Sequence, residues 1–74
     1  SDWSTAVEEY EKLVTKHPTF KYSVSSLLRV GEIQATKLKL KEQAISTYNR
    51  VAAEYPDSTL QAIEALQRSA KLYQ

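Results

Sequence analysis

The chain lacks cysteine and methionine, and its 74 residues include one glycine, one histidine and two prolines. Without cysteine it can form neither a disulfide framework nor a thiolate metal site, and both oxidising and reducing compartments remain open to it. The absence of methionine indicates a processed chain or a fragment of a longer one. Because glycine and proline are so scarce, the composition favours helix almost throughout.

A large charge excess and a long apolar run are also missing. Ten basic residues stand against nine acidic ones, which argues against nucleic acid as a partner. The lysines at 37, 39 and 41 have no interleaved aromatic residues, so we interpret them as a solvated turn. Apolar runs reach only two or three residues, which predicts no membrane insertion and no signal peptide. A chain of this length forms one small domain, spanning residues 1–74.

Apolar residues recur at spacings of three and four in four segments, and this period predicts four helices. The first begins within residues 1–5 and ends near Lys16, ahead of Pro18. The second covers residues 24–37, the third about 42–54 ahead of Pro56, and the fourth about 59–74. Residues 5–8 and 58–61 fit the capping-box pattern at helix starts. Ser4 or Asp2 are alternative caps for the first helix, and Asp57 or Ser58 caps the fourth.

Two single residues carry specific expectations. Gly31 lies inside the second helix, where glycine costs about 1 kcal/mol relative to alanine, so we expect a close helix–helix approach there. The apolar band of this helix is wide, which predicts contacts with two neighbouring helices. His17 has no second ligand or orienting acid nearby in the sequence, so we expect a partly buried contact between helices and neither metal binding nor catalysis.

The chain repeats itself after 38 residues. Ala6, Tyr10, Pro18 and Leu28 recur as Ala44, Tyr48, Pro56 and Leu66. Conservative replacements follow the same shift: Val7/Ile45, Leu13/Val51, Lys12/Arg50 and His17/Tyr55. Matches at positions that pack or end a helix are typical of a helical repeat array.

These residues resemble the tetratricopeptide repeat (TPR) family. Leu27, Val30 and Gly31 fit the first helix of its unit, although Gln34 stands where an aromatic residue is usual. Ala44, Tyr48 and Pro56 fit the second helix, whereas Val51 is larger than the usual alanine. The resemblance implies an all-α fold, namely an antiparallel α-hairpin stack of about four helices forming a fragment of a right-handed solenoid. One complete repeat would span about 24–57, flanked by half repeats.

The sequence YPDS at 55–58, the pair AL at 65–66 and the segment AKLY at 70–73 are similar to TPRs of bacterial cell-envelope assembly proteins. That similarity implies a periplasmic or cell-envelope location, with the cytoplasm as the alternative.

In the TPR family the first helices of successive units line a groove that binds a peptide or a partner helix. The resemblance therefore implies a non-catalytic protein-binding scaffold with no cofactor and no metal. The implied partner-binding residues are Leu28, Glu32, Ala35, Thr36, Ile63, Leu66, Ala70 and Tyr73, with Ser25 on the same face. The alternative is structural: apolar faces of the terminal helices mediate self-association into a homo-oligomer.

Overall fold

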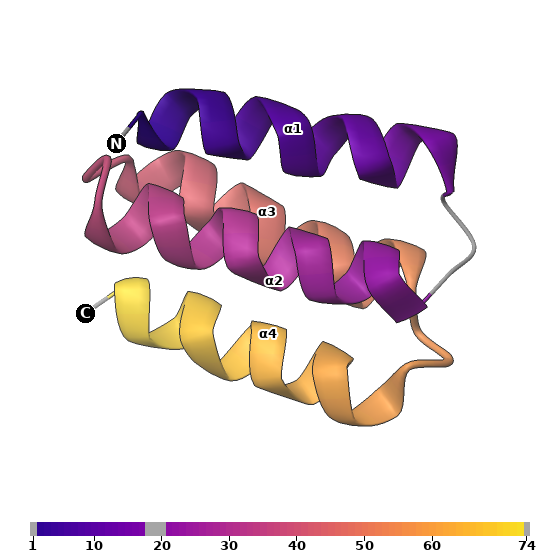
Figure 1. Cartoon of the computed structure of the whole chain (residues 1–74). Coiled ribbons are helices and arrows are strands. Elements are labelled where there is room, and N and C mark those ends of the chain that lie inside the picture. Colours follow the sequence, from indigo (N-terminus) through magenta and orange to yellow (C-terminus); the bar gives the residue numbers. More distant parts are fainter. Residues whose placement is uncertain (1, 18–20, 74) are drawn as a thin grey trace.

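The computed structural model describes residues 2–17 and 21–73, with only the backbone of Lys21. It contains four α-helices: α1 (Trp3–Lys16), α2 (Lys21–Thr36), α3 (Lys41–Glu54) and α4 (Thr59–Leu72). Successive helices run in opposite directions (Figure 1). No strand occurs in the described ranges, and the predicted all-α fold is confirmed.

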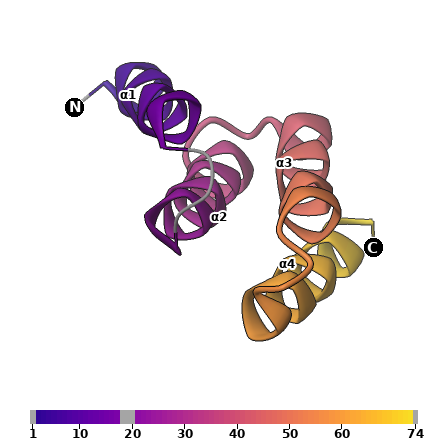
Figure 2. The same ribbon diagram turned by 90° about the vertical axis from the view of Figure 1, so that its right-hand side faces the viewer.

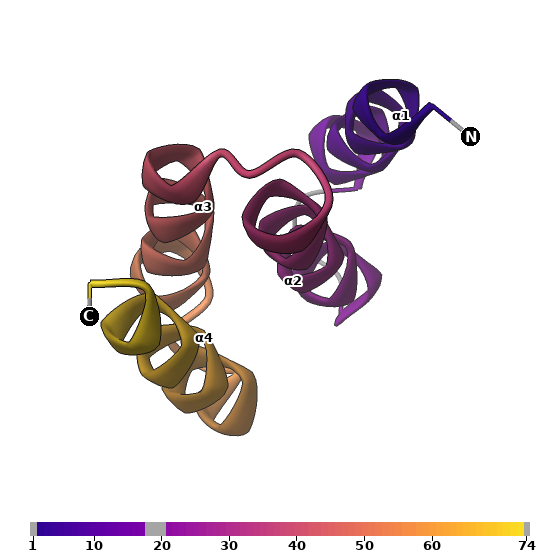
Figure 3. The same cartoon turned by 90° about the vertical axis from the view of Figure 1, so that its left-hand side faces the viewer.

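The helices form two rows. Seen end-on, the chain zigzags so that α1 and α3 lie on one side and α2 and α4 on the other (Figures 2 and 3). The Cα atoms span 30 × 30 × 13 Å. Helix α2 packs against α1 and α3, and α4 packs against α3 and touches α2. The two-neighbour expectation for the second helix and the α-hairpin stack are therefore confirmed.

The caps of α1 and α4 differ from the predicted capping boxes. Asp2 is the N-cap of α1, and its carboxylate accepts hydrogen bonds from the Thr5 amide at 3.2 Å and the Thr5 hydroxyl at 2.7 Å. Both bonds lower the pKa of Asp2 because they favour the charged carboxylate, and the bond from the Thr5 hydroxyl has the larger effect. Thr5 is thus a donor inside the helix and not its cap, and the alternative cap Asp2 is confirmed. At α4, the predicted cap Ser58 is the N-cap, but it makes no side-chain cap hydrogen bond, so the cap residue is confirmed and the capping box is wrong.

The helix ends follow the predicted signals. Helix α3 ends at Glu54, and the amide of its C-cap Tyr55 donates to the Val51 carbonyl at 3.0 Å just before Pro56. The turn between α2 and α3 closes without glycine because Lys39 adopts φ 58°, a left-handed conformation. The Leu40 amide then donates to the Gln34 carbonyl at 2.7 Å. Pro18 lies outside the described residues, so the predicted stop there is untested.

Side chains from all four helices form one core. The buried cluster consists of Val14, Val24, Leu27, Ala44, Tyr48, Val51 and Ala65. Beside it, a Cβ placed on Gly31 would lie 2.6 Å from Tyr48 Cε1, well inside van der Waals contact. The predicted close approach at Gly31 is confirmed, and the buried Tyr48 ring is what requires it.

A polar pair joins α2 to α3 inside this core. Gln34 and Thr47 are both buried, and the Thr47 hydroxyl donates to Gln34 Oε1 at 2.6 Å. The Gln43 carbonyl oxygen, 2.9 Å away, is a second acceptor for the same hydroxyl. Glutamine therefore occupies the place of the usual aromatic residue because threonine on the facing helix satisfies it.

Thr47→Val tests this pair. Because Gln34 Oε1 would lose its donor in a buried place, we expect a loss of about 1–3 kcal/mol in the free energy of unfolding, measured by urea denaturation. Gln34→Leu together with Thr47→Val removes both polar groups, and we expect the double variant to recover most of that loss. Strictly additive costs in this double-mutant cycle would show that the two side chains are not coupled.

Candidate partner-binding site

The predicted binding residues divide between two helices on one side of the stack. Leu28, Glu32, Ala35 and Thr36 lie on α2, Ile63, Leu66 and Ala70 lie on α4, and Tyr73 is the C-cap of α4. Helices α2 and α4 share the same row (Figure 2) and touch each other. The fold thus brings together the two helices that carry the predicted residues.

The α2 and α4 halves of this face differ in how far their apolar side chains are exposed. On α4, Ile63 is 48%, Leu66 51% and Tyr73 69% exposed, so apolar side chains face solvent along the helix. On α2, Leu28 and Ala35 are partly buried against the core cluster. The apolar surface available to a partner on this face is therefore supplied chiefly by α4.

Ion pairs at Glu32 connect α2 and α4. Its carboxylate pairs with Arg29 one turn earlier in α2 and lies 3.6 Å from Arg68 Nη1 in α4. Arg68 also pairs with Glu64 at 2.9 Å. A hydrogen bond with Tyr48 and, to a lesser extent, the carboxylates of Glu64 and Glu32 raise the pKa of the Arg68 guanidinium. Because two arginines face the two glutamates Glu32 and Glu64, we expect the charges of this network to balance.

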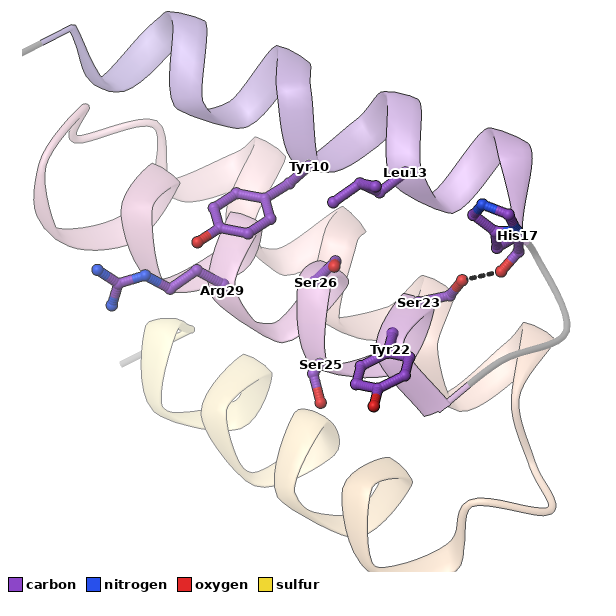
Figure 4. A pocket seen from close by; sticks show the side chains of 8 residues that line it. All are labelled: Tyr10, Leu13, His17, Tyr22, Ser23, Ser25, Ser26 and Arg29. Atoms are coloured by element: carbon purple, nitrogen blue, oxygen red, sulfur yellow. Dashed lines mark hydrogen bonds between the residues drawn. The ribbon is translucent and has the colours of Figure 1, made fainter.

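The structure contains a pocket that the sequence pattern did not indicate. A cavity of about 650 Å³ lies between α1 and α2, and its lining comprises Tyr10, Leu13, His17, Tyr22, Ser23, Ser25, Ser26 and Arg29. Tyr10 and Leu13 reach from α1 toward α2 (Figure 4). None of the eight predicted binding residues lines it, although Ser25 does. A usable signal was present, since Leu13 pairs with Val51 across the repeat, yet none of the described helices covers it.

His17 lies at the end of this pocket, and its side chain is exposed. The predicted partly buried imidazole is therefore wrong. The contact between the helices runs through its backbone, because the Ser23 hydroxyl donates to the His17 carbonyl oxygen (Figure 4).

Residues 2–17 and 21–73 contain neither a candidate metal-binding cluster nor a candidate membrane-spanning helix. No three His, Cys, Asp or Glu side chains there gather closely enough to hold a metal ion. None of the four helices is long and apolar enough to cross a bilayer.

Comparison with known families agrees with this geometry. Residues 25–58 match the family model described as tetratricopeptide repeat. The matched segment contains most of α2, all of α3 and the turn between them, so the centre of the chain is a TPR-like repeat. Neither the curated proteins nor the solved structures that were compared give a match.

TPR repeats generally mediate contacts between proteins, and the class defined here is a TPR-like helical repeat. The match gives no support for the cell-envelope subtype. It also leaves the division into one complete repeat at 24–57 and two half repeats as a prediction.

Proposed function

We propose that this chain is a non-catalytic protein-binding module that holds a peptide or a helix of another protein on the face made by α2 and α4. The observation that carries the proposal is the row of half-exposed apolar side chains on α4, at Ile63, Leu66 and Tyr73, beside a helix of the matched repeat. Buried apolar contacts would supply the affinity, and the flanking ion pairs would orient the ligand.

The side chains on this face limit the classes of ligand that it can bind. An extended or helical peptide with apolar side chains spaced to meet α4 fits it best. A free chaperone carboxy terminus fits poorly, since the predicted groove positions carry Glu32 and no lysine or asparagine. Periplasm or cell envelope is the proposed compartment, with the cytoplasm as the alternative; this rests only on the sequence similarity at 55–58, 65–66 and 70–73.

Peptide selection tests the proposal. Random 12-residue peptides displayed on phage would be selected against the immobilised chain, and the enriched peptides synthesised with a fluorophore for anisotropy titration. We expect Ile63→Glu to weaken the selected peptides at least about tenfold, equal to about 1.4 kcal/mol, because it places a charge in the apolar row.

Two further variants make the result specific. Ser46→Glu adds the same charge to an exposed position on α3, in the other row of helices, and we expect it to leave binding unchanged. Leu13→Glu alters the pocket between α1 and α2. If Leu13→Glu abolishes binding and Ile63→Glu does not, the α2/α4 face is not the binding site.

A further inference from the structure

The first observation concerns α1, which exposes a position, Leu13, whose counterpart in α3 is buried. Across the 38-residue repeat, Tyr10 and Leu13 correspond to Tyr48 and Val51. Val51 is 0% exposed and joins the core cluster with residues of α2, whereas Leu13 is 50% exposed and lines the pocket. The difference has a simple cause: α2 covers α3, and no helix of the described chain covers the same face of α1.

The second observation concerns α4, which exposes positions that α2 covers in part. Leu66 and Tyr73 correspond to Leu28 and Ala35. Leu28 and Ala35 pack against the core cluster, of which Ala65 on α4 is a member. Leu66 and Tyr73 are 51% and 69% exposed, since no described helix covers α4 in the way that α4 covers α2.

Helices α1 and α4, which carry the two uncovered faces, are the outermost helices of the stack (Figure 1). In the middle of the molecule, α2 lies against both α3 and α4. Across the 38-residue repeat, α4 corresponds to α2, and the pair α1 and α2 corresponds to the pair α3 and α4. The uncovered faces therefore match the two sides of this internal interface. We propose that α4 of one copy docks in the α1–α2 pocket of a second copy, so that this chain assembles head to tail.

The charges are compatible with this contact. The apolar row on α4, at positions 60, 63, 66, 70 and 73, contains no charged residue. The pocket lining contains no carboxylate, and its Arg29 is already paired with Glu32. No like charges are therefore forced together, and the contact buries apolar surface on both sides. Because two different faces meet, the contact does not close on itself and each copy can accept another.

Sedimentation equilibrium on three chains tests the inference. We expect the average mass of the wild-type chain to rise with concentration, up to ~1 mM, beyond twice the 8.4 kDa of one copy. Leu13→Glu spoils only the pocket and Leu66→Glu only the α4 row, so each variant alone should remain at the mass of one copy. Both side chains are half exposed, and circular dichroism would verify that the helices are retained.

The decisive measurement is an equal mixture of Leu13→Glu and Leu66→Glu. Each partner then keeps the face that the other needs, and we expect a complex of two copies that grows no further. The control Ser46→Glu should assemble like the wild type. Should Leu13→Glu or Leu66→Glu fail to fold, glutamine at the same position gives a milder version of the test.

Three results would overturn the inference: a wild-type chain that stays at one copy throughout, a mixture that does not associate, or a dimer that Leu66→Glu abolishes and Leu13→Glu leaves intact. The last would mean that two α4 rows meet each other. The α4 row is shared with the proposed peptide site, so peptide binding is measured separately, with an added peptide and Ile63→Glu, and its outcome does not depend on whether copies assemble.

Discussion

Replacing Gly31 with leucine is expected to destabilise the chain by at least about 1–3 kcal/mol, through overpacking against Tyr48. Even a Cβ at this position would lie 2.6 Å from Tyr48 Cε1, and the Tyr48 ring is buried, so it has little room to move. For a domain of this size each kcal/mol lowers the melting temperature by roughly 4–8 °C. Thermal unfolding followed by circular dichroism measures the shift.

The position of the added side chain, and not leucine itself, should cause this loss. Ser25→Leu places the same residue on an exposed part of α2, where we expect little change in melting temperature. Tyr48→Ala should partly rescue Gly31→Leu by making space, so the double variant should lose less than the sum of the single losses. A melting temperature that rises with Gly31→Leu would mean that α2 does not approach Tyr48 closely.

Leu27→Ala is expected to cost about 2–5 kcal/mol, because it opens a cavity in the core. Leu27 is 0% exposed and belongs to the cluster that joins the four helices. For 74 residues the whole free energy of unfolding is about 4–11 kcal/mol, at 0.05–0.15 kcal/mol per residue. This single truncation can therefore remove most of the stability, and urea denaturation should show a much lower midpoint.

The neighbouring residue supplies a matched control. Leu28→Ala removes the same atoms from a side chain that is only partly buried against the cluster, so the loss should be clearly smaller. Equal losses for Leu27→Ala and Leu28→Ala would contradict the orientation of α2, because the two side chains would then be buried alike.

Much of the fold was predictable because its signals are local. Apolar spacing located the four helices, and Pro56 marked the end of α3 near Glu54. Lys37 and Lys39 lie in the turn between α2 and α3, and Lys41 begins α3. The cap residues were harder to predict. Asp2, Ser4 and Thr5 can all cap a helix, and the choice depends on which of them takes the extended backbone conformation, as Asp2 does.

Contacts between distant residues were harder to predict. Gln34 looked misplaced until its partner Thr47, 13 residues away, was seen to donate to it. Leu13 has the spacing of a core residue, yet it is half exposed because none of the four described helices covers it. The eight predicted partner-binding residues remain predictions, since their selection came from a family resemblance and depends on a ligand.

The amino-acid sequence determines that this chain forms helices, where they end and that they repeat, because periodicity, proline and glycine act over a few residues. The arrangement of the helices decides which apolar faces are covered. A face is buried only when another helix lies on it, and the repeat makes Leu13 and Val51 alike in sequence but opposite in exposure. The pocket between α1 and α2 and the apolar row on α4 follow from that difference.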